Sequence, residues 1–397
     1  MKNFLPYSRQ LIDDDDVAAV TEVLRSDFLT TGPKVNEFEA AFAAKINAKH
    51  VVACSSGTAG LHMATNAIEL RPDDVAIVPA ITFLSTANAV RFTGAEVVFA
   101  DVDPDTGLIT PETADAALVR AKNARAILPV HLNGQCCDMD TLKPWADQKS
   151  LFVIEDACHV LGGGYGDGNL VGSGSDRITV FSGHPVKNIA MGEGGIVTTD
   201  NSDLFNKLIC LRSHGIERNS ENFKATGQAF AADGKPNPWY YEMDSLGFNY
   251  RASDIHCALG LSQLEKLDAF VQRQNRLVKV YAELLSPLSP VAKPVMSTNN
   301  GMPAWHVATV LIDFKAVKID RATVMNKLRE KGIGSQVLYI PLTRQPYYRH
   351  RYGELLLPNA EAYYARTLCL PLFPSMTDDD VDRVVETLQN ILGLNGV

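Results

Sequence analysis

The stretch from Leu151 to Asp156, Leu-Phe-Val-Ile-Glu-Asp, constrains the fold of this chain more than any other feature. Its first four residues form a continuously apolar run, which is typical of a strand that is covered on both faces in a parallel sheet. Glu155 and Asp156 follow at the carboxyl end of this predicted strand, the edge at which open α/β sheets bind ligands. Taken alone, Asp156 fits the N-cap of a following helix equally well.

A second stretch places a lysine between two predicted strands. The apolar runs 178–181 and 196–198 flank a Gly-containing segment that holds Lys187. A lysine in an apolar pocket is desolvated, which lowers its pKa and lets the neutral amine form a Schiff base with an aldehyde. The alternative is a solvated lysine beside a surface turn. With Asp156 one strand away, the pair provides what pyridoxal 5'-phosphate (PLP) requires, because the carboxylate keeps the pyridine nitrogen protonated.

A third stretch, Ser55-Ser56-Gly57-Thr58-Ala59, follows the predicted strand 50–54 and leads into a helix predicted to begin near Gly60. Small residues at such a turn let backbone N–H groups approach an anion at the helix N-terminus, and the hydroxyls add donors. This chemistry suits a phosphate, although an N-capped helix without any ligand has the same pattern.

Composition excludes some partners. The chain has 397 residues and a net charge of -9, so it lacks the basic field that draws proteins to nucleic acid or anionic lipid. No apolar run is long enough to cross a bilayer, and the N-terminus lacks a signal-peptide core, which predicts a cytoplasmic protein without membrane contact.

Seven cysteines without a Cys-x-x-Cys pair predict reduced thiols. A metal site at Cys136 and Cys137 with His131 or His159 is disfavoured by the spacing, so no metal is expected.

Strand and helix patterns alternate through the first two thirds of the chain, which predicts an α/β unit with a mostly parallel sheet. Further strands are expected at 75–79, 97–99 and 126–130. Residues 220–237 are polar and predict a mobile excursion that could close over substrate. A long helix through Tyr281 and a Pro-bearing segment, 286–303, lead to a smaller α+β unit, with strands at 307–312 and 336–341 and a helix at 324–330. The predicted domains are residues 1–265 and 266–397.

Six motifs in order resemble those of the DegT/DnrJ/EryC1/StrS family of PLP-dependent sugar aminotransferases, over nearly the whole chain. The motifs are Ser55–Ala59, Pro79–Phe83, Glu155–His159, His184–Lys187, Gly192–Gly195 and Leu246–Arg251. Residues 211–215, followed by an insertion and by 238–243, are most similar to the subgroup of UDP-4-amino-4,6-dideoxy-N-acetyl-β-L-altrosamine transaminases of the pseudaminic acid pathway. Together the motifs are far more specific than any one of them.

The resemblance implies an aspartate aminotransferase-like fold (fold type I), with a large domain around a mostly parallel mixed sheet and a smaller C-terminal α+β domain. It implies that Lys187 and Asp156 are catalytic, with Lys187 joined to PLP as a Schiff base and acting as the general base. The other cofactor-binding residues that it implies are Gly57, Thr58, Ala59, Phe83, His159, Ser182 and Asn249. Phe83 would stack on the ring, Ser182 would bind the phosphate, and Asn249 would reach the cofactor phosphate of a neighbouring subunit.

The implied reaction moves an amino group from glutamate to C4 of a nucleotide-linked 4-keto-6-deoxy sugar, for cell-surface glycan or nonulosonic acid synthesis, in a homodimer with shared active sites. Three positions depart from the family pattern. Gly183 replaces a common aromatic, which predicts room beside the lysine, and Leu338 and Thr343 replace histidines near the expected sugar nucleotide. A GDP- or dTDP-linked keto sugar with a 3- or 4-amino product therefore stays an alternative, as does a non-catalytic regulator.

Two other enzyme classes are disfavoured. Related PLP-dependent dehydratases carry His where this chain has Lys187. A nucleotide-binding oxidoreductase would need a Gly-x-Gly-x-x-Gly turn after its first strand, and this chain has none there.

Overall fold

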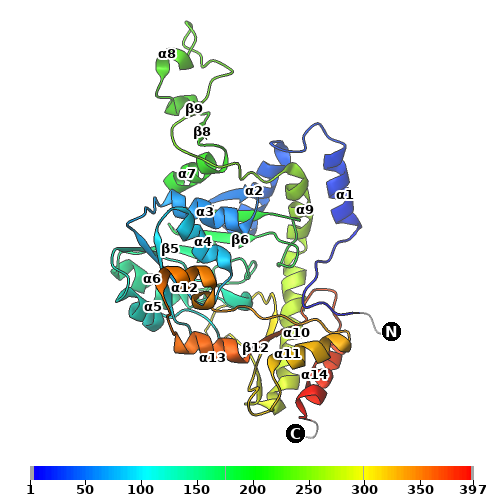
Figure 1. Ribbon diagram of the computed structural model, residues 1–397. Coiled ribbons are helices and arrows are strands. Elements are labelled where there is room, and N and C mark those ends of the chain that lie inside the picture. The colour runs from blue at the N-terminus through cyan, green and yellow to red at the C-terminus, as the bar shows by residue number, and fades with distance from the viewer. Residues whose placement is uncertain (1–3, 175, 298, 395–397) are drawn as a thin grey trace.

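A computed structural model describes residues 4–174, 176–297 and 299–394, and its centre is a seven-stranded sheet flanked by helices (Figure 1). The strand order is β1-β7-β6-β5-β4-β2-β3, and β7 runs antiparallel to both of its neighbours while the other pairs are parallel. The mostly parallel mixed sheet of an α/β protein is therefore confirmed. The strands are β1 His50–Cys54, β2 Val75–Pro79, β3 Glu96–Ala100, β4 Ala124–Ile127, β5 Phe152–Asp156, β6 Ile178–Ser182 and β7 Gly195–Thr199.

The helices of this unit begin at recognisable capping residues. Asp13 and Asp16 form a capping box at the start of α1, and Pro33 opens α2 at a position where no amide donor is needed. The helix after β1 begins at Gly57, three residues earlier than predicted, because the Ser56 hydroxyl accepts a hydrogen bond from the Ala59 amide. The helices are α1 Asp14–Leu24, α2 Pro33–Ile46, α3 Gly57–Ala67, α4 Leu84–Phe92, α5 Pro111–Leu118, α6 Met139–Gln148 and α7 Ser202–Arg212.

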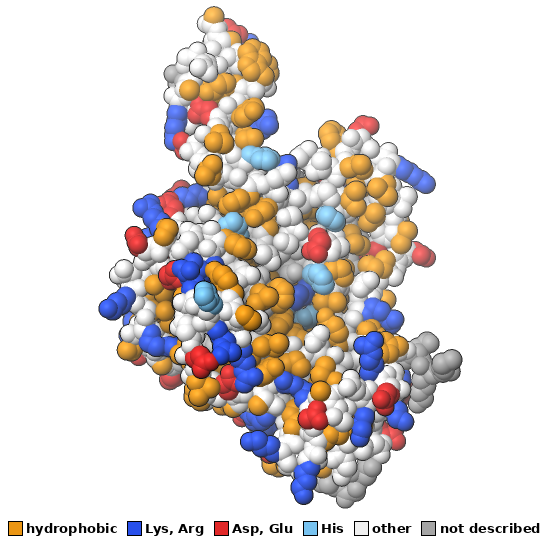
Figure 2. Space-filling view, viewed as in Figure 1, with side chains coloured by type: hydrophobic (Ala, Val, Ile, Leu, Met, Phe, Trp, Pro, Cys, Tyr) orange, Lys and Arg blue, Asp and Glu red, His pale blue; other side chains and the backbone are white. Residues whose placement is uncertain are grey.

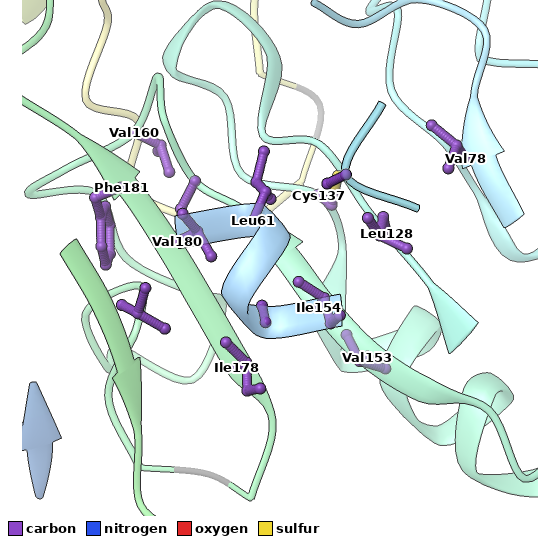
Figure 3. Packing of buried hydrophobic residues seen from close by; sticks show 14 of the residues in the cluster. Leu61, Val78, Leu128, Cys137, Val153, Ile154, Val160, Ile178, Val180 and Phe181 are labelled. Atoms are coloured by element: carbon purple, nitrogen blue, oxygen red, sulfur yellow. The ribbon is translucent and has the colours of Figure 1, made fainter. Parts of the chain in front are cut away.

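The main hydrophobic core lies where α3 packs on the sheet. Figure 3 shows Leu61 of α3 among Ile154 of β5 and Val180 of β6, and all three side chains are buried. Burying a side chain of this size contributes about 2 kcal/mol to the free energy of folding. This packing fixes the carboxyl ends of β5 and β6 relative to the start of α3, and those three ends carry the predicted site residues.

The C-terminal part forms a second core around a three-stranded antiparallel sheet, in the order β10-β11-β12. The single long helix of the sequence prediction is two helices that meet at Lys266. The domain boundary at 265/266 stays a prediction, and Leu5 from the N-terminal end also pairs with Ile333. The elements are α9 Asp254–Glu265, α10 Leu267–Leu285, β10 Ala292–Pro294, β11 Ala308–Ile312, α11 Arg321–Glu330, α12 Pro346–Tyr352, α13 Pro358–Arg366, β12 Thr367–Leu370 and α14 Asp378–Leu392.

The predicted strand at 336–341 is wrong. Only Gln336 pairs with a neighbour, through two backbone hydrogen bonds with Cys369 of β12, and the following residues adopt irregular backbone. Their apolar side chains have a different role, since Val337, Leu338 and Ile340 line a cavity. The strands that pair with β11 are instead β10 and β12, and the sequence predicted neither of them.

Residues 216–243 form an arm that projects from the body beyond α7 (Figure 1). Its base is the two-stranded pairing of β8, Ile216–Glu217, with β9, Glu242–Met243, and it carries the short helix α8, Thr226–Ala229. Hydrophobic side chains gather on the arm (Figure 2), and Trp239 is 73% exposed. Its mobility and its closure over substrate stay predictions. None of the helices in the described ranges combines the length and the apolar character needed to cross a membrane.

Candidate active site

A cavity of about 580 Å³ lies at the carboxyl ends of β5 and β6, beneath the irregular segment that follows Gln336. The structure brings seven of the predicted site residues together in its wall: Gly57, Thr58, Phe83, Asp156, His159, Ser182 and Lys187. Two predicted residues are elsewhere. Ala59 lies one residue beyond the wall and uses its amide to cap α3, and Asn249 is exposed outside the cavity.

Lys187 lies in the loop between β6 and β7, as the two flanking apolar runs predicted. The loop is closed by the Gly183 amide, which donates to the Gly194 carbonyl at 2.8 Å, and the Lys187 amide donates to the His184 carbonyl at 2.8 Å. Burial lowers the pKa of the Lys187 amine to about 8, even though Cys158 and Asp156 act in the opposite direction. Lys187 is therefore desolvated, and a large share of its amine is neutral at mildly alkaline pH.

Asp156 ends β5 and is held from both sides. Its amide donates to the Pro129 carbonyl at 2.9 Å, which fixes the backbone against the neighbouring chain segment. The Cys158 amide donates to Oδ1 at 3.2 Å, and the Thr86 hydroxyl donates to Oδ2 at 2.6 Å. Among the residues that the structure describes, no Lys, Arg or His forms an ion pair with this buried carboxylate. A cationic group bound in the cavity would supply the missing partner.

The turn at the start of α3 has the geometry of an anion cradle. The amides of Gly57 and Thr58 lie in the first helical turn, where backbone N–H groups have no acceptor within the helix. A Cβ on Gly57 would lie 3.1 Å from Cys158 Sγ and 3.2 Å from Ser182 Cβ, so a side chain at this position would crowd the turn. Ser182, at the end of β6, brings its hydroxyl to the same wall of the cavity.

Sequence reasoning missed two residues of the wall, Tyr339 and His306, and both lie beside the predicted His159. The His159 Nδ1 accepts a hydrogen bond from the Asn133 amide at 3.4 Å, so Nε2 carries the proton and donates to the Tyr339 hydroxyl at 3.1 Å. Burial raises the pKa of Tyr339 well above its usual value. His306 is buried 4.6 Å from the His159 ring, its Nδ1 has no partner among the described residues, and burial lowers its pKa well below the usual value. No local pattern marks His306 or Tyr339, because their proximity to His159 arises only on folding.

A buried polar cluster supports the strand end from behind. Glu155 accepts hydrogen bonds from His131 Nε2 and from the Tyr165 hydroxyl, each at 2.8 Å, and forms an ion pair with Arg177. Burial alone would raise the pKa of Glu155, but Arg177 and His131 outweigh burial and lower it. The His131 Nδ1 accepts the Cys137 amide at 2.9 Å, so both ring nitrogens are engaged. Across the described ranges, no group of His, Cys, Asp or Glu could hold a metal ion.

The structure corrects one interpretation of the three departures. Gly183 does not leave room beside the lysine, because Met191 fills that space and a Cβ at position 183 would lie 2.5 Å from its sulfur. Leu338 lines the cavity and packs with Val307 and Cys369. Thr343 is buried and is not among the described residues that line the cavity.

An open α/β sheet that aims a desolvated lysine, a carboxylate and an anion cradle into one cavity defines the class of PLP-dependent enzymes. The model of the DegT/DnrJ/EryC1/StrS aminotransferase family matches residues 10–389, and this chain belongs to that family. It is a PLP-dependent sugar aminotransferase, as the six sequence motifs predicted.

Known relatives match over almost their full length. The spore coat polysaccharide biosynthesis protein SpsC of Bacillus subtilis (strain 168) is 40% identical over 393 residues, which cover 98% of this chain and 97% of SpsC. The solved structure of Helicobacter pylori PseC, an aminotransferase involved in the biosynthesis of pseudoaminic acid, has a TM-score of 0.89 and 26% identity, over 99% of this chain and 100% of PseC. Spr1654 from Streptococcus pneumoniae, assigned as a sugar aminotransferase and solved in its PLP form, has a TM-score of 0.86 and 25% identity, over 98% and 99%.

The residues of the cavity fit PLP on their own chemistry. The Lys187 amine can join an aldehyde, the open turn at Gly57 with Ser182 can hold a phosphate, and Asp156 lacks a cation that a protonated ring nitrogen would supply. The Nδ1 of His306 is a buried polar atom without a partner among the described residues, in the same wall, as expected where a ligand or water completes the hydrogen bonding.

Proposed function

We propose that this aminotransferase moves the amino group of glutamate to C4 of a UDP-linked 4-keto-6-deoxy-N-acetylhexosamine, for the synthesis of a cell-surface glycan or a nonulosonic acid. The observation that carries the catalytic part is a half-buried, desolvated Lys187, with a pKa of about 8, in one cavity with Asp156. The substrate part is supported by the likeness to PseC and SpsC and by the motif at 211–215 with the insertion after it.

Lys187 and Asp156 divide the proposed chemistry. PLP, when bound, supplies an electron sink that makes the hydrogen on the donor's α-carbon acidic. Lys187 removes that proton from the α-carbon of glutamate and, in the second half-reaction, delivers a proton to C4 of the sugar. Its lowered pKa suits both tasks, because the amine can hold and release a proton near neutral pH. Asp156 would lie beside the ring nitrogen of the bound cofactor and favour its protonated form.

The remaining wall residues bind and orient. Gly57, Thr58 and Ser182 would hold the cofactor phosphate, and Phe83, which is 51% exposed and 5.8 Å from the Tyr339 ring, would cover the cofactor ring. His159 would approach the ring oxygen from the side of Tyr339. Leu338 gives the sugar side of the cavity an apolar surface in place of a histidine, which suits a methyl group at C6.

We also infer that the active site is shared between two copies of the chain. Among the described residues that line the cavity, Lys187 is the only lysine or arginine, yet a cofactor phosphate, a nucleotide diphosphate and a dicarboxylic donor all need cationic or amide partners. A second copy could provide them, with Asn249 exposed and Arg251 near it in the chain. All seven cysteines are free, which suits the reducing cytoplasm where we place the reaction.

Two experiments test these proposals. Purified protein is incubated with glutamate and a panel of UDP-, GDP- and dTDP-linked 3-keto and 4-keto sugars, and products are identified by mass spectrometry and NMR. Amination of only a GDP- or dTDP-linked sugar would reject the proposed UDP-linked substrate. If no sugar is aminated, the alternative of a non-catalytic regulator that retains the fold would be favoured. Lys187→Ala should abolish turnover while circular dichroism and the elution volume stay unchanged; full activity of this variant would reject the catalytic assignment.

Shared sites are tested by mixing two inactive variants, Lys187→Ala and Asn249→Glu, whose new negative charge would repel the cofactor phosphate. If sites are shared, mixed dimers regain one complete site, and activity returns to roughly a quarter of the wild-type level after random subunit exchange. A monomer by light scattering, or no recovery in dimers shown to have exchanged subunits, would reject the shared site.

A further inference from the structure

Two buried threonine hydroxyls form a chain that ends on Asp156. Thr86, in the first turn of α4, donates its hydroxyl to Asp156 Oδ2 at 2.6 Å. The Thr82 hydroxyl lies 2.7 Å from the Thr86 hydroxyl, and Thr82 lines the cavity. Both threonines are almost completely buried, so water does not compete for these bonds.

The direction of this chain follows from donor counting. A carboxylate that accepts bonds from an amide and a hydroxyl offers no proton, so the single proton of Thr86 is directed at Asp156. Thr86 must then accept at its oxygen, and Thr82 is the donor. Two hydroxyls aligned in this sense polarise one another, and each strengthens the bond that follows it. Hydrogen bonds to separate oxygens of a carboxylate fix its orientation.

We propose that Thr86, assisted by Thr82, is a positioning residue that holds the Asp156 carboxylate toward the ring nitrogen of PLP. This inference rests on the proposed role of Asp156. The two contacts occupy separate oxygens, the Cys158 amide on Oδ1 and Thr86 on Oδ2, so rotation of the carboxylate would break both at once. Because Asp156 has no ion pair with a described residue, these neutral donors are what keeps it aligned before the cofactor binds.

The test uses a cofactor analogue that separates positioning from folding. In 1-deaza-PLP a C–H group replaces the ring nitrogen, so this analogue cannot pair with Asp156 but keeps the aldehyde and the phosphate. The dissociation constants of PLP and 1-deaza-PLP are measured by absorbance titration of the protein prepared without cofactor. Their ratio reports only the interaction at the ring nitrogen, whereas a damaged fold would weaken both ligands equally.

Thr86→Val should lower the preference for PLP over 1-deaza-PLP by about tenfold, because a hydrogen bond to a charged group contributes about 1.5 kcal/mol and a factor of ten is 1.4 kcal/mol. Thr82→Val should lower it by roughly threefold, since only the outer donor is lost. Thr86→Ser should restore the preference. Thr65→Val is the matched control, because Thr65 is equally buried but bonds only to the backbone carbonyls of His62 and Ala89.

The two possible failures are distinguishable. If wild type shows no preference and Asp156→Asn binds both ligands like wild type, the role of Asp156 itself is rejected. If Asp156→Asn loses the preference but Thr86→Val keeps it, or weakens both ligands equally, the positioning role of Thr86 is rejected while Asp156 keeps its own.

Discussion

Lys187 should destabilise the protein when the cofactor is absent. Its pKa in the folded protein is about 8, against an ordinary value of 10.5. The unfolded chain therefore binds more protons between about pH 8 and pH 10.5, so stability rises with pH across this window and the penalty is fully developed below it. With these two values, the penalty at pH 7 is about 3 kcal/mol, falling to about 1.4 kcal/mol at pH 9.5.

Replacing Lys187 by Met keeps the length of the side chain and removes the charge. The variant without cofactor should be more stable than wild type without cofactor by about 3 kcal/mol at pH 7 and by about half of that at pH 9.5. The free energy of unfolding is measured by urea denaturation at both pH values, at one protein concentration so that any association is held constant.

Lys279→Met, at an exposed position of α10, is the control, and it should show no gain that fades with pH. If Lys187→Met leaves the stability at pH 7 unchanged, or if its gain is the same at both pH values, the lysine is not desolvated. The inference of an amine poised near neutral pH would then be refuted.

Three further predictions concern other parts of the molecule. Gly195→Ala should lower the free energy of unfolding by at least about 3 kcal/mol, because a Cβ there would overlap the Ser56 carbonyl oxygen, whereas Gly227→Ala meets open space and should be tolerated. Asp16→Ala should lower the free energy of unfolding by about 3 kcal/mol in the same urea assay, because this buried carboxylate binds three side chains of the α9 region. Asp15→Ala, at an exposed position, should change the free energy of unfolding little, and equal effects of the two substitutions would contradict the reasoning. Burial raises the pKa of all seven thiols, so the native protein should react slowly with Ellman's reagent at pH 7 and faster as the pH rises. All seven thiols should react quickly only in denaturant. A thiol of the native protein that reacts quickly at pH 7 would contradict this prediction.

The sequence predicted the elements whose signals are local. Apolar runs identified all seven strands of the main sheet, because strands covered on both faces carry apolar side chains at most positions, although β4 begins two residues and ends three residues earlier than the predicted range 126–130. The acid at the end of β5 and the lysine between β6 and β7 were therefore placed correctly on the sheet edge, with both in one cavity. The family motifs added the reaction class, because they describe the site as a set.

Predictions from local sequence patterns were wrong where the environment of a residue is set by tertiary contacts. Residues 336–341 form an apolar run like that of a strand, but Val337, Leu338 and Ile340 line the cavity, and only Gln336 pairs with β12. The sequence predicted open space beside the lysine at Gly183, but the side chain of Met191, from the same loop, fills that space.

The sequence by itself determined which strands form the sheet and that a lysine and an aspartate would meet at its carboxyl edge, because burial on two faces imposes a composition that can be read along the chain. Only the tertiary structure decided what surrounds that pair. Thr86 reaches Asp156 across 70 positions of sequence, and Tyr339 reaches His159 across 180. Hydrogen bonds between such distant residues depend on how the elements pack, and no periodicity along the chain encodes them.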